Sequence, residues 1–135
     1  ATTLCGIWTN IDWDRVVWPP TRELDRAFAD KVFTNEDRHL PGIWQIADQI
    51  TDENGRRLPT GVGGSNAGHV YDVDARDAAS LTEGIMKGRK QLLEYRKYFR
   101  EYLDGYEDME LVWSAAFTLP QGAKYRAGDH WNERE

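Results

Sequence analysis

Hydrophobic and polar positions follow a helical spacing over one long stretch, residues 79–105. Apolar or small residues recur there at steps of three and four: Leu81, Ile85, Gly88, Leu92, Tyr95, Phe99 and Tyr102. This spacing places their side chains along one stripe of an α-helix. Lysines and glutamates occupy the opposite side, where Lys90 and Glu94 lie one turn apart and are expected to pair weakly. The pattern predicts a long amphipathic helix that needs a broad surface to lie on.

The sequence also marks both ends of this helix. Ser80 followed by Glu83 matches a capping box, and Gly105 follows the last periodic residue, where glycine readily closes a helix. Three arginines form a row beside the apolar stripe: Arg89, Arg96 and Arg100. Such arginines usually pair at a surface, and the alternative is a docking face for acidic groups of another domain.

Shorter patterns predict the remaining elements. Apolar or alternating runs indicate strands at residues 1–8, 43–50, 69–74 and 109–118, and a short helix is expected at residues 22–33. In the second run we expect Trp44, Ile46, Asp48 and Ile50 to face the core.

Turn signals separate these runs. Asn54-Gly55 is a strong hairpin signal, and residues 60–68, which are rich in glycine, are expected to form a flexible loop. Together the elements predict a single α+β domain over residues 1–135, with a small mixed β-sheet and one long amphipathic helix packed across it.

Composition narrows the classes of partner. The chain of 135 residues carries a net charge of -6, which disfavours binding to nucleic acid or to an anionic membrane surface. It contains no apolar run of the roughly 20 residues that a membrane span requires. Cys5 is the only cysteine, so the sequence leaves the compartment open, with the cytoplasm favoured. From the beginning and the end of the sequence we expect a piece or a subunit of a longer protein.

The glycine-rich segment invites comparison with a dinucleotide fingerprint, which lies between a strand and a helix. Gly61 and Gly63 have the first spacing of that motif, but Asn66 occupies the third glycine position and a strand is expected to follow. The order of elements therefore favours a mobile or substrate-facing loop over a phosphate cradle.

Metal sites and catalytic motifs are not indicated. Residues 72–83 have three acidic positions of a calcium loop, but Arg76 and Asp77 occupy its fifth and sixth positions, where an oxygen ligand and a glycine are needed. No histidine has a ligand partner at metal spacing, and no nucleophile motif is present. We expect no metal and identify no catalytic residue.

Six tryptophans are many for this length, and three of them fall early, at Trp8, Trp13 and Trp18. They are compatible with core packing, with a covered interface, or with a platform on which sugar rings stack. A non-enzymatic binding module, for example for carbohydrate, is therefore an alternative function.

The run from His69 to Tyr95 contains Asp72 and Asp74, then Ser-Leu-Thr at residues 80–82 and Gly-Arg-Lys-Gln at residues 88–91. This run resembles the middle region of a family of FAD-dependent oxidoreductases. Members carry an aspartate-rich turn, then Ser-Leu-Thr as at residues 80–82, then a long helix with a Gly-Arg-Arg-Gln-like run as at residues 88–91. Residues 102–112, YLDGYEDMELV, are similar to the turn and strand that follow in the family. The resemblance covers residues 60–130, and no glycine fingerprint accompanies it.

The resemblance implies a substrate-side or cap domain of a flavoprotein, inactive alone, whose parent transfers a hydride from a small-molecule substrate to FAD. The FAD-binding portion of the same protein or a partner subunit would hold the cofactor. Arg126 and Gly128-Asp129 match a run that lies close to the flavin in the family, and Lys124 takes the place of one of its charges. We therefore expect Lys124 and Arg126 on the flavin side, and Asn66 and His69 in the substrate pocket.

Overall fold

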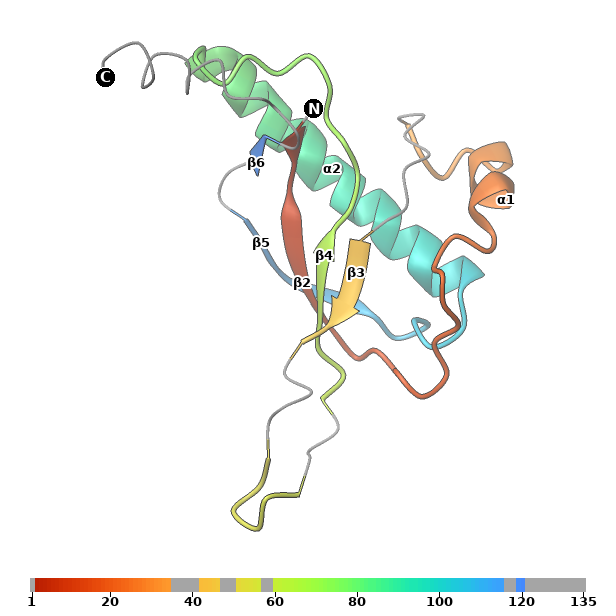
Figure 1. Ribbon diagram of the computed structural model, residues 1–135. Coiled ribbons are helices and arrows are strands. Elements are labelled where there is room, and N and C mark those ends of the chain that lie inside the picture. The colour runs from red at the N-terminus through yellow and green to blue at the C-terminus, as the bar shows by residue number, and fades with distance from the viewer. Residues whose placement is uncertain (1, 35–41, 47–50, 57–59, 116–118, 121–135) are drawn as a thin grey trace, which may run out of the picture.

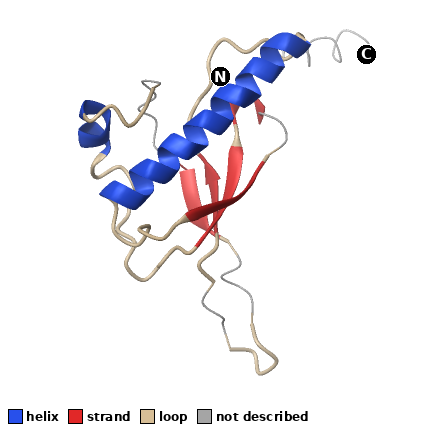
Figure 2. Ribbon diagram, turned by 180° about the vertical axis from the view of Figure 1, so that it is seen from behind, coloured by secondary structure: helices blue, strands red, loops and turns tan. Residues whose placement is uncertain are grey.

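A computed structural model describes residues 2–34, 42–46, 51–56, 60–115 and 119–120 of the chain. Eight elements follow one another: β1 (Thr2–Thr3), β2 (Cys5–Thr9), α1 (Leu24–Ala29), β3 (Gly42–Gln45), β4 (Gly63–Asn66), α2 (Ala78–Tyr102), β5 (Glu110–Ser114) and β6 (Leu119–Pro120). The long helix α2 lies diagonally across one face of a small sheet (Figures 1 and 2). The predicted α+β class and the long amphipathic helix are confirmed.

The main sheet has the strand order β3-β4-β2-β5. Each strand pair that the structure describes is antiparallel, including the separate pair of β1 with β6, whereas a mixed sheet was expected. The strands β3 and β4 form a hairpin whose tip, around Asn54 and Gly55, projects away from α2 (Figure 1). Gly55 has a φ of 76°, and the side chain of Asp52 accepts hydrogen bonds from the backbone N–H groups of Asn54 and Arg56. The predicted hairpin is present, but three residues, 53–55, separate the paired Asp52 and Arg56 instead of the two of an Asn-Gly turn.

The glycine-rich segment is a strand rather than a flexible loop. Gly63–Asn66 forms β4, an inner strand hydrogen-bonded to both β2 and β3. A Cβ atom on Gly64 would lie 2.9 Å from the Trp44 ring, and one on Gly63 would lie 2.7 Å from Ile11 and 3.0 Å from Trp13. The glycines thus leave room for large side chains that cover the strand from both faces, which the sequence pattern of residues 60–68 did not reveal.

The facing of β3 is the reverse of the prediction. Ile43 is 1% exposed, whereas Trp44 is 47% exposed and lies over Gly64 on the outer face of the sheet. Residues 47–50 of the predicted strand lie outside the described part. The expected strand at residues 69–74 is reduced to a single bridge between Val70 and Thr2.

Helix α1 is shorter than the predicted residues 22–33. Lys31 adopts a φ of 58°, and the N–H groups of Lys31 and Val32 return to the carbonyls of Phe28 and Ala27. This pair of hydrogen bonds is a Schellman motif, which ends the helix.

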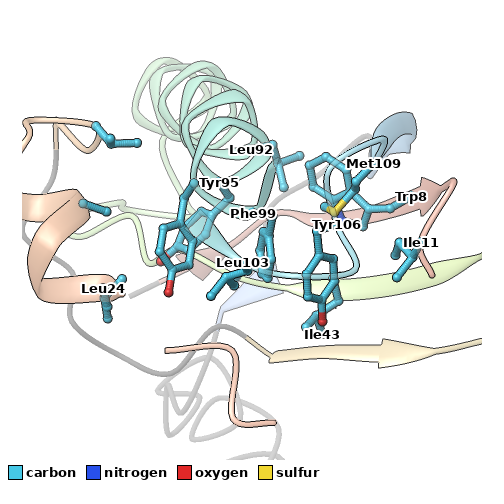
Figure 3. Packing of buried hydrophobic residues seen from close by; sticks show 14 of the residues in the cluster. Trp8, Ile11, Leu24, Ile43, Leu92, Tyr95, Phe99, Leu103, Tyr106 and Met109 are labelled. Atoms are coloured by element: carbon cyan, nitrogen blue, oxygen red, sulfur yellow. The ribbon is translucent and has the colours of Figure 1, made fainter. Parts of the chain in front are cut away.

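The core lies between α2 and the inner face of the sheet and is rich in aromatic rings (Figure 3). Trp8 from β2, Phe99 from α2 and Tyr106 are fully buried, and the rings of Phe99 and Tyr106 lie 4.8 Å apart. Two glycines of α2 allow close approach of the helix, since a Cβ on Gly88 would lie 3.0 Å from Leu4 and one on Gly84 would lie 2.8 Å from Val73. The helix therefore rests directly on the N-terminal strands and on the segment before it.

The arginine row pairs partly with the sheet. Arg96 donates two hydrogen bonds, of 2.8 and 2.6 Å, to the Glu110 carboxylate at the start of β5, and Arg100 donates a third. The hydrogen bonds from Arg96 lower the pKa of Glu110 below its ordinary value. Two of the three arginines therefore link α2 to β5, which confirms the expectation of pairing for them.

Candidate functional site

A cavity of about 460 Å³ lies beside the third and fourth turns of α2. It is lined by Thr34, Val70, Tyr71, Asp72, Lys87, Lys90 and Gln91. One side is the segment 70–72, which directly follows His69, and the other is α2. Thr34 contributes from the chain that leaves α1.

The helix side of the cavity follows from helical spacing. Lys87, Lys90 and Gln91 are separated by three and four residues, so their side chains leave α2 on one face. Gln91 is only 6% exposed, and its Nε2 donates a 2.9 Å hydrogen bond to the carbonyl oxygen of His69. Gln91 thereby ties the opposite wall of the cavity to the helix.

The wall formed by residues 70–72 has further anchors. Val70 exchanges two backbone hydrogen bonds with Thr2, of 2.8 and 2.7 Å. Gly68 has a φ of 80°, and a Cβ there would lie 3.0 Å from both Gln91 and Tyr95, so this position requires glycine. The rings of Tyr71 and His69 stack with their centroids 6.1 Å apart.

Thr34 is anchored to α2 as well. Its backbone N–H and its hydroxyl both donate to the Glu94 carboxylate, at 3.1 and 2.6 Å. Glu94 was expected to pair with Lys90, and instead it binds Thr34. Lys90 consequently forms no ion pair with any residue that the structure describes.

The charged residues that line the cavity in the described part of the chain are two lysines and one aspartate. Lys87 pairs with Glu83 at 2.9 Å, but both side chains are more than half exposed, so water screens the attraction. Asp72 makes no ion pair within the described ranges either. The arrangement presents cationic groups on the helix side and a carboxylate on the loop side.

The predicted substrate residues, Asn66 and His69, are not among the described residues that line this cavity. Asn66 is the last residue of β4, paired with Cys5 on one side and Gly42 on the other, and its buried Oδ1 has no hydrogen-bond partner among the described residues. His69 contributes its carbonyl oxygen to Gln91 and its ring to Tyr71. His69 therefore supports the cavity wall, whereas Asn66 pairs within the sheet.

The residues that line the cavity were not identified from the sequence. Lys87 and Lys90 looked like members of an exposed charged row, because the periodicity of α2 alone places them opposite the apolar stripe. The cavity forms because residues 70–72 and Thr34, which come from other parts of the chain, lie beside these two lysines. The one available signal was the i, i+3, i+4 spacing of two lysines and a glutamine.

A smaller hollow of about 240 Å³ lies where the β2–α1 connection meets the hairpin, lined by Ile11, Asp12, Trp13, Asp14, Gln45, Thr60 and Gly61. Trp13 packs against Gly63 and lies edge-on to Tyr106, with their ring centroids 6.2 Å apart. Trp8, in contrast, is fully buried and donates a 2.7 Å hydrogen bond from Nε1 to Ser65 Oγ. Trp8 therefore cannot offer a stacking face, as a platform of Trp8, Trp13 and Trp18 would require.

The described residues do not fit the diphosphate of FAD. A diphosphate is cradled by a glycine turn at a helix N-terminus, whereas Gly63 and Gly64 lie inside a sheet under Ile11, Trp13 and Trp44. Lys124 and Arg126, expected on the flavin side, lie outside the described residues.

Within the part that is described, no three His, Cys, Asp or Glu side chains gather to hold a metal ion. None of the helices described combines the length and apolar character that a membrane crossing needs.

Comparison of the chain with protein-family models, with curated proteins and with solved structures finds no match. The resemblance to FAD-dependent oxidoreductases stays a prediction from the sequence.

Proposed function

We propose that this chain is the substrate-side part of a FAD-dependent oxidoreductase, with FAD held by another portion of the same protein or by a partner subunit. The redox chemistry belongs to the flavin-bearing part, and this chain contributes a pocket that binds the substrate. On its own the chain is then inactive.

The observation that carries this proposal is the position of the cavity. Both of its long sides, residues 70–72 and the Lys87–Gln91 face of α2, belong to the stretch that resembles the family. Its volume of about 460 Å³ is within the range of roughly 300–1,000 Å³ typical of small-molecule sites. His69 holds the wall of this pocket through Gln91 and Tyr71, and Asn66 ends the strand that leads to it.

Exposed apolar side chains support the expectation that another portion of the protein, or a partner subunit, docks on this chain. Met86 and Leu93 lie seven residues apart on one side of α2 and are 66% and 59% exposed. On the strand β5, Val112 and Trp113 are 62% and 51% exposed. A flavin-bearing portion docked on these surfaces would remove them from water.

The test is to isolate the natural protein with an antibody raised against this chain and to measure its visible absorption and peptide map. We expect flavin absorption from the purified species that contains the chain, and no FAD binding by residues 1–135 produced alone. A colourless natural protein would overturn the proposal.

The second candidate is a non-enzymatic carbohydrate-binding module, and the hollow around Trp13 favours it. An aromatic ring beside two carboxylates, the Gln45 amide and the Thr60 hydroxyl combines a stacking surface with hydrogen-bonding groups suited to sugar hydroxyls. Titration with oligosaccharides would then change tryptophan fluorescence in wild type and in Trp18→Phe, but not in Trp13→Phe. An unchanged signal in wild type would exclude this candidate.

A further inference from the structure

We propose that the cavity between α2 and residues 70–72 is a binding site for a small hydroxy carboxylate, that is, a monocarboxylate that also carries hydroxyl groups. That this ligand is the substrate of the oxidoreductase rests on the proposed function. Binding itself is a property of this chain alone.

The cavity is held open by contacts on each of its sides. Gln91 binds the carbonyl of His69, Thr2 binds Val70 through two backbone hydrogen bonds, and Glu94 binds Thr34 through two more. These contacts join four parts of the chain that are far apart in sequence. A ligand therefore meets groups that are already positioned, which reduces the entropy lost on binding.

The helix side of the cavity is suited to a carboxylate. Lys90 has no carboxylate partner among the described residues, because Glu94 is occupied by Thr34. Lys87, one turn earlier, is held only by an exposed pair with Glu83. A carboxylate placed between the two ammonium groups would form charge-assisted hydrogen bonds without having to break a buried ion pair.

The opposite side is suited to hydroxyl groups. Asp72 accepts hydrogen bonds, and the Thr34 hydroxyl, whose proton is donated to Glu94, keeps lone pairs that accept as well. Tyr71 is 42% exposed and adds an aromatic surface against which the carbon chain of a ligand can lie. Hydroxyl donors on the ligand would satisfy the two acceptors.

The same aspartate argues against a phosphate ligand. Among the described residues two lysines face Asp72, and the Glu83 and Glu94 carboxylates lie beside them on Lys87 and Thr34, so a monoanion is compensated better than a phosphate dianion. The net charge of -6 on the whole chain adds to this preference.

The probe is gluconate, with sorbitol as its uncharged counterpart of equal carbon number, titrated into the purified chain by calorimetry. We expect saturable binding of gluconate and none of sorbitol. Lys90→Gln should weaken gluconate binding about tenfold by removing a charge-assisted hydrogen bond, and Lys90→Arg should retain most of it. The matched control is Lys97→Gln, an exposed lysine on the same helix outside the cavity, which should bind as wild type does.

Each contrary result is decisive. Absence of gluconate binding, equal binding of sorbitol, or equal weakening by Lys97→Gln would overturn the site, and tighter binding of inorganic phosphate would overturn the ligand class. Circular dichroism of each variant shows whether it is folded. The titration uses no flavin, so gluconate binding by a colourless natural protein would remove the proposed function and keep the site. If the natural protein carries flavin but its chain does not bind gluconate, the proposed function is kept and the site is removed.

Discussion

At the scale of single residues, a hydrogen bond between the side chains of Trp8 and Ser65 joins two strands on the inner face of the sheet. A Cβ on Gly6 would lie 3.2 Å from both the Trp8 Nε1 and the Ser65 Oγ atoms, so glycine leaves the space in which these two groups meet. Both side chains are buried, and water cannot replace either partner. The indole N–H therefore depends on this one serine.

Ser65→Ala should destabilise the protein by about 1–3 kcal/mol, because it leaves a buried donor unsatisfied. Urea unfolding followed by tryptophan fluorescence measures the change. Ser114→Ala is the control, since Ser114 is half-buried on the neighbouring strand β5 and its side chain makes no hydrogen bond within the described residues. Equal losses in the two variants would show that the hydrogen bond to Trp8 is not the cause.

Gly105 is another residue whose identity is fixed by its surroundings. Its φ is 89°, and a Cβ there would lie 2.7 Å from the backbone oxygen of Asp12, while its own carbonyl accepts a 2.8 Å hydrogen bond from the Asp12 N–H. Gly55 has a similar φ of 76° with no atom within 4 Å of the same position. The two glycines share a conformation and differ in crowding.

Gly55→Ala should therefore cost about 1–2 kcal/mol, the usual cost of a left-handed conformation for an alanine. Gly105→Ala should cost clearly more, because the backbone of Asp12 must also move. Thermal unfolding of the two variants checks the difference. If both lose the same stability, the contact with Asp12 does not restrict the position.

At the scale of elements, helix α2 begins earlier in the chain than the sequence pattern predicted. The N-cap is Asp77, whose carboxylate accepts a 2.8 Å hydrogen bond from the N–H of Ser80. Ser80 does not cap the helix, and its Oγ accepts from the N–H of Asp74 instead. Glu83 pairs with Lys87 in the next turn. The predicted capping box of Ser80 and Glu83 is wrong because Asp77 offers an equivalent cap three residues earlier.

Asp77→Ala should lower the free energy of unfolding by about 1 kcal/mol, the typical value of an N-cap. Glu83→Ala, which removes only an exposed ion pair, should cost less than about 0.5 kcal/mol. Chemical unfolding followed by helix circular dichroism compares the two. A larger loss for Glu83→Ala would support the capping box in place of the Asp77 cap.

At the scale of the whole molecule, tyrosines tie the helix to distant parts of the chain. Tyr98 is fully buried and donates a 3.0 Å hydrogen bond to the carbonyl of Pro20, which belongs to the connection before α1. Burial raises the pKa of Tyr98 from 10.0 to about 12, and burial also raises the pKa of Tyr106. Burial therefore keeps both phenols protonated up to alkaline pH.

The contribution of the protonated Tyr98 to the free energy of unfolding should be fully present below pH 10 and should be lost as the pH rises toward 12. The unfolded chain releases the phenolic proton near its ordinary pKa of 10.0, whereas the folded chain retains it up to about 12. Tyr98→Phe should be about 1 kcal/mol less stable at neutral pH, through loss of the hydrogen bond to Pro20, yet should lose less between pH 10 and 12.

Unfolding curves at several alkaline pH values test this, with Tyr71→Phe as the control because the Tyr71 ring is exposed. An equal alkaline loss in Tyr98→Phe and in the wild type would show that another group is responsible.

The sequence alone determined the class of fold, the long helix and the hairpin, because each depends on local patterns. Steps of three and four between apolar residues define a helix stripe, and Asn-Gly favours a tight turn with few requirements from distant residues. Gly88, Leu92, Tyr95 and Phe99 of the predicted stripe are all buried against the core.

Only the tertiary structure decided what the glycine-rich segment and the lysines do. Gly63 and Gly64 form an inner strand because Ile11, Trp13 and Trp44 fill the space that side chains would otherwise take, and those residues come from other parts of the chain. Lys87 and Lys90 line a cavity because Thr34 and residues 70–72 fold against α2. Such contacts join residues far apart in sequence, so no local pattern specifies them.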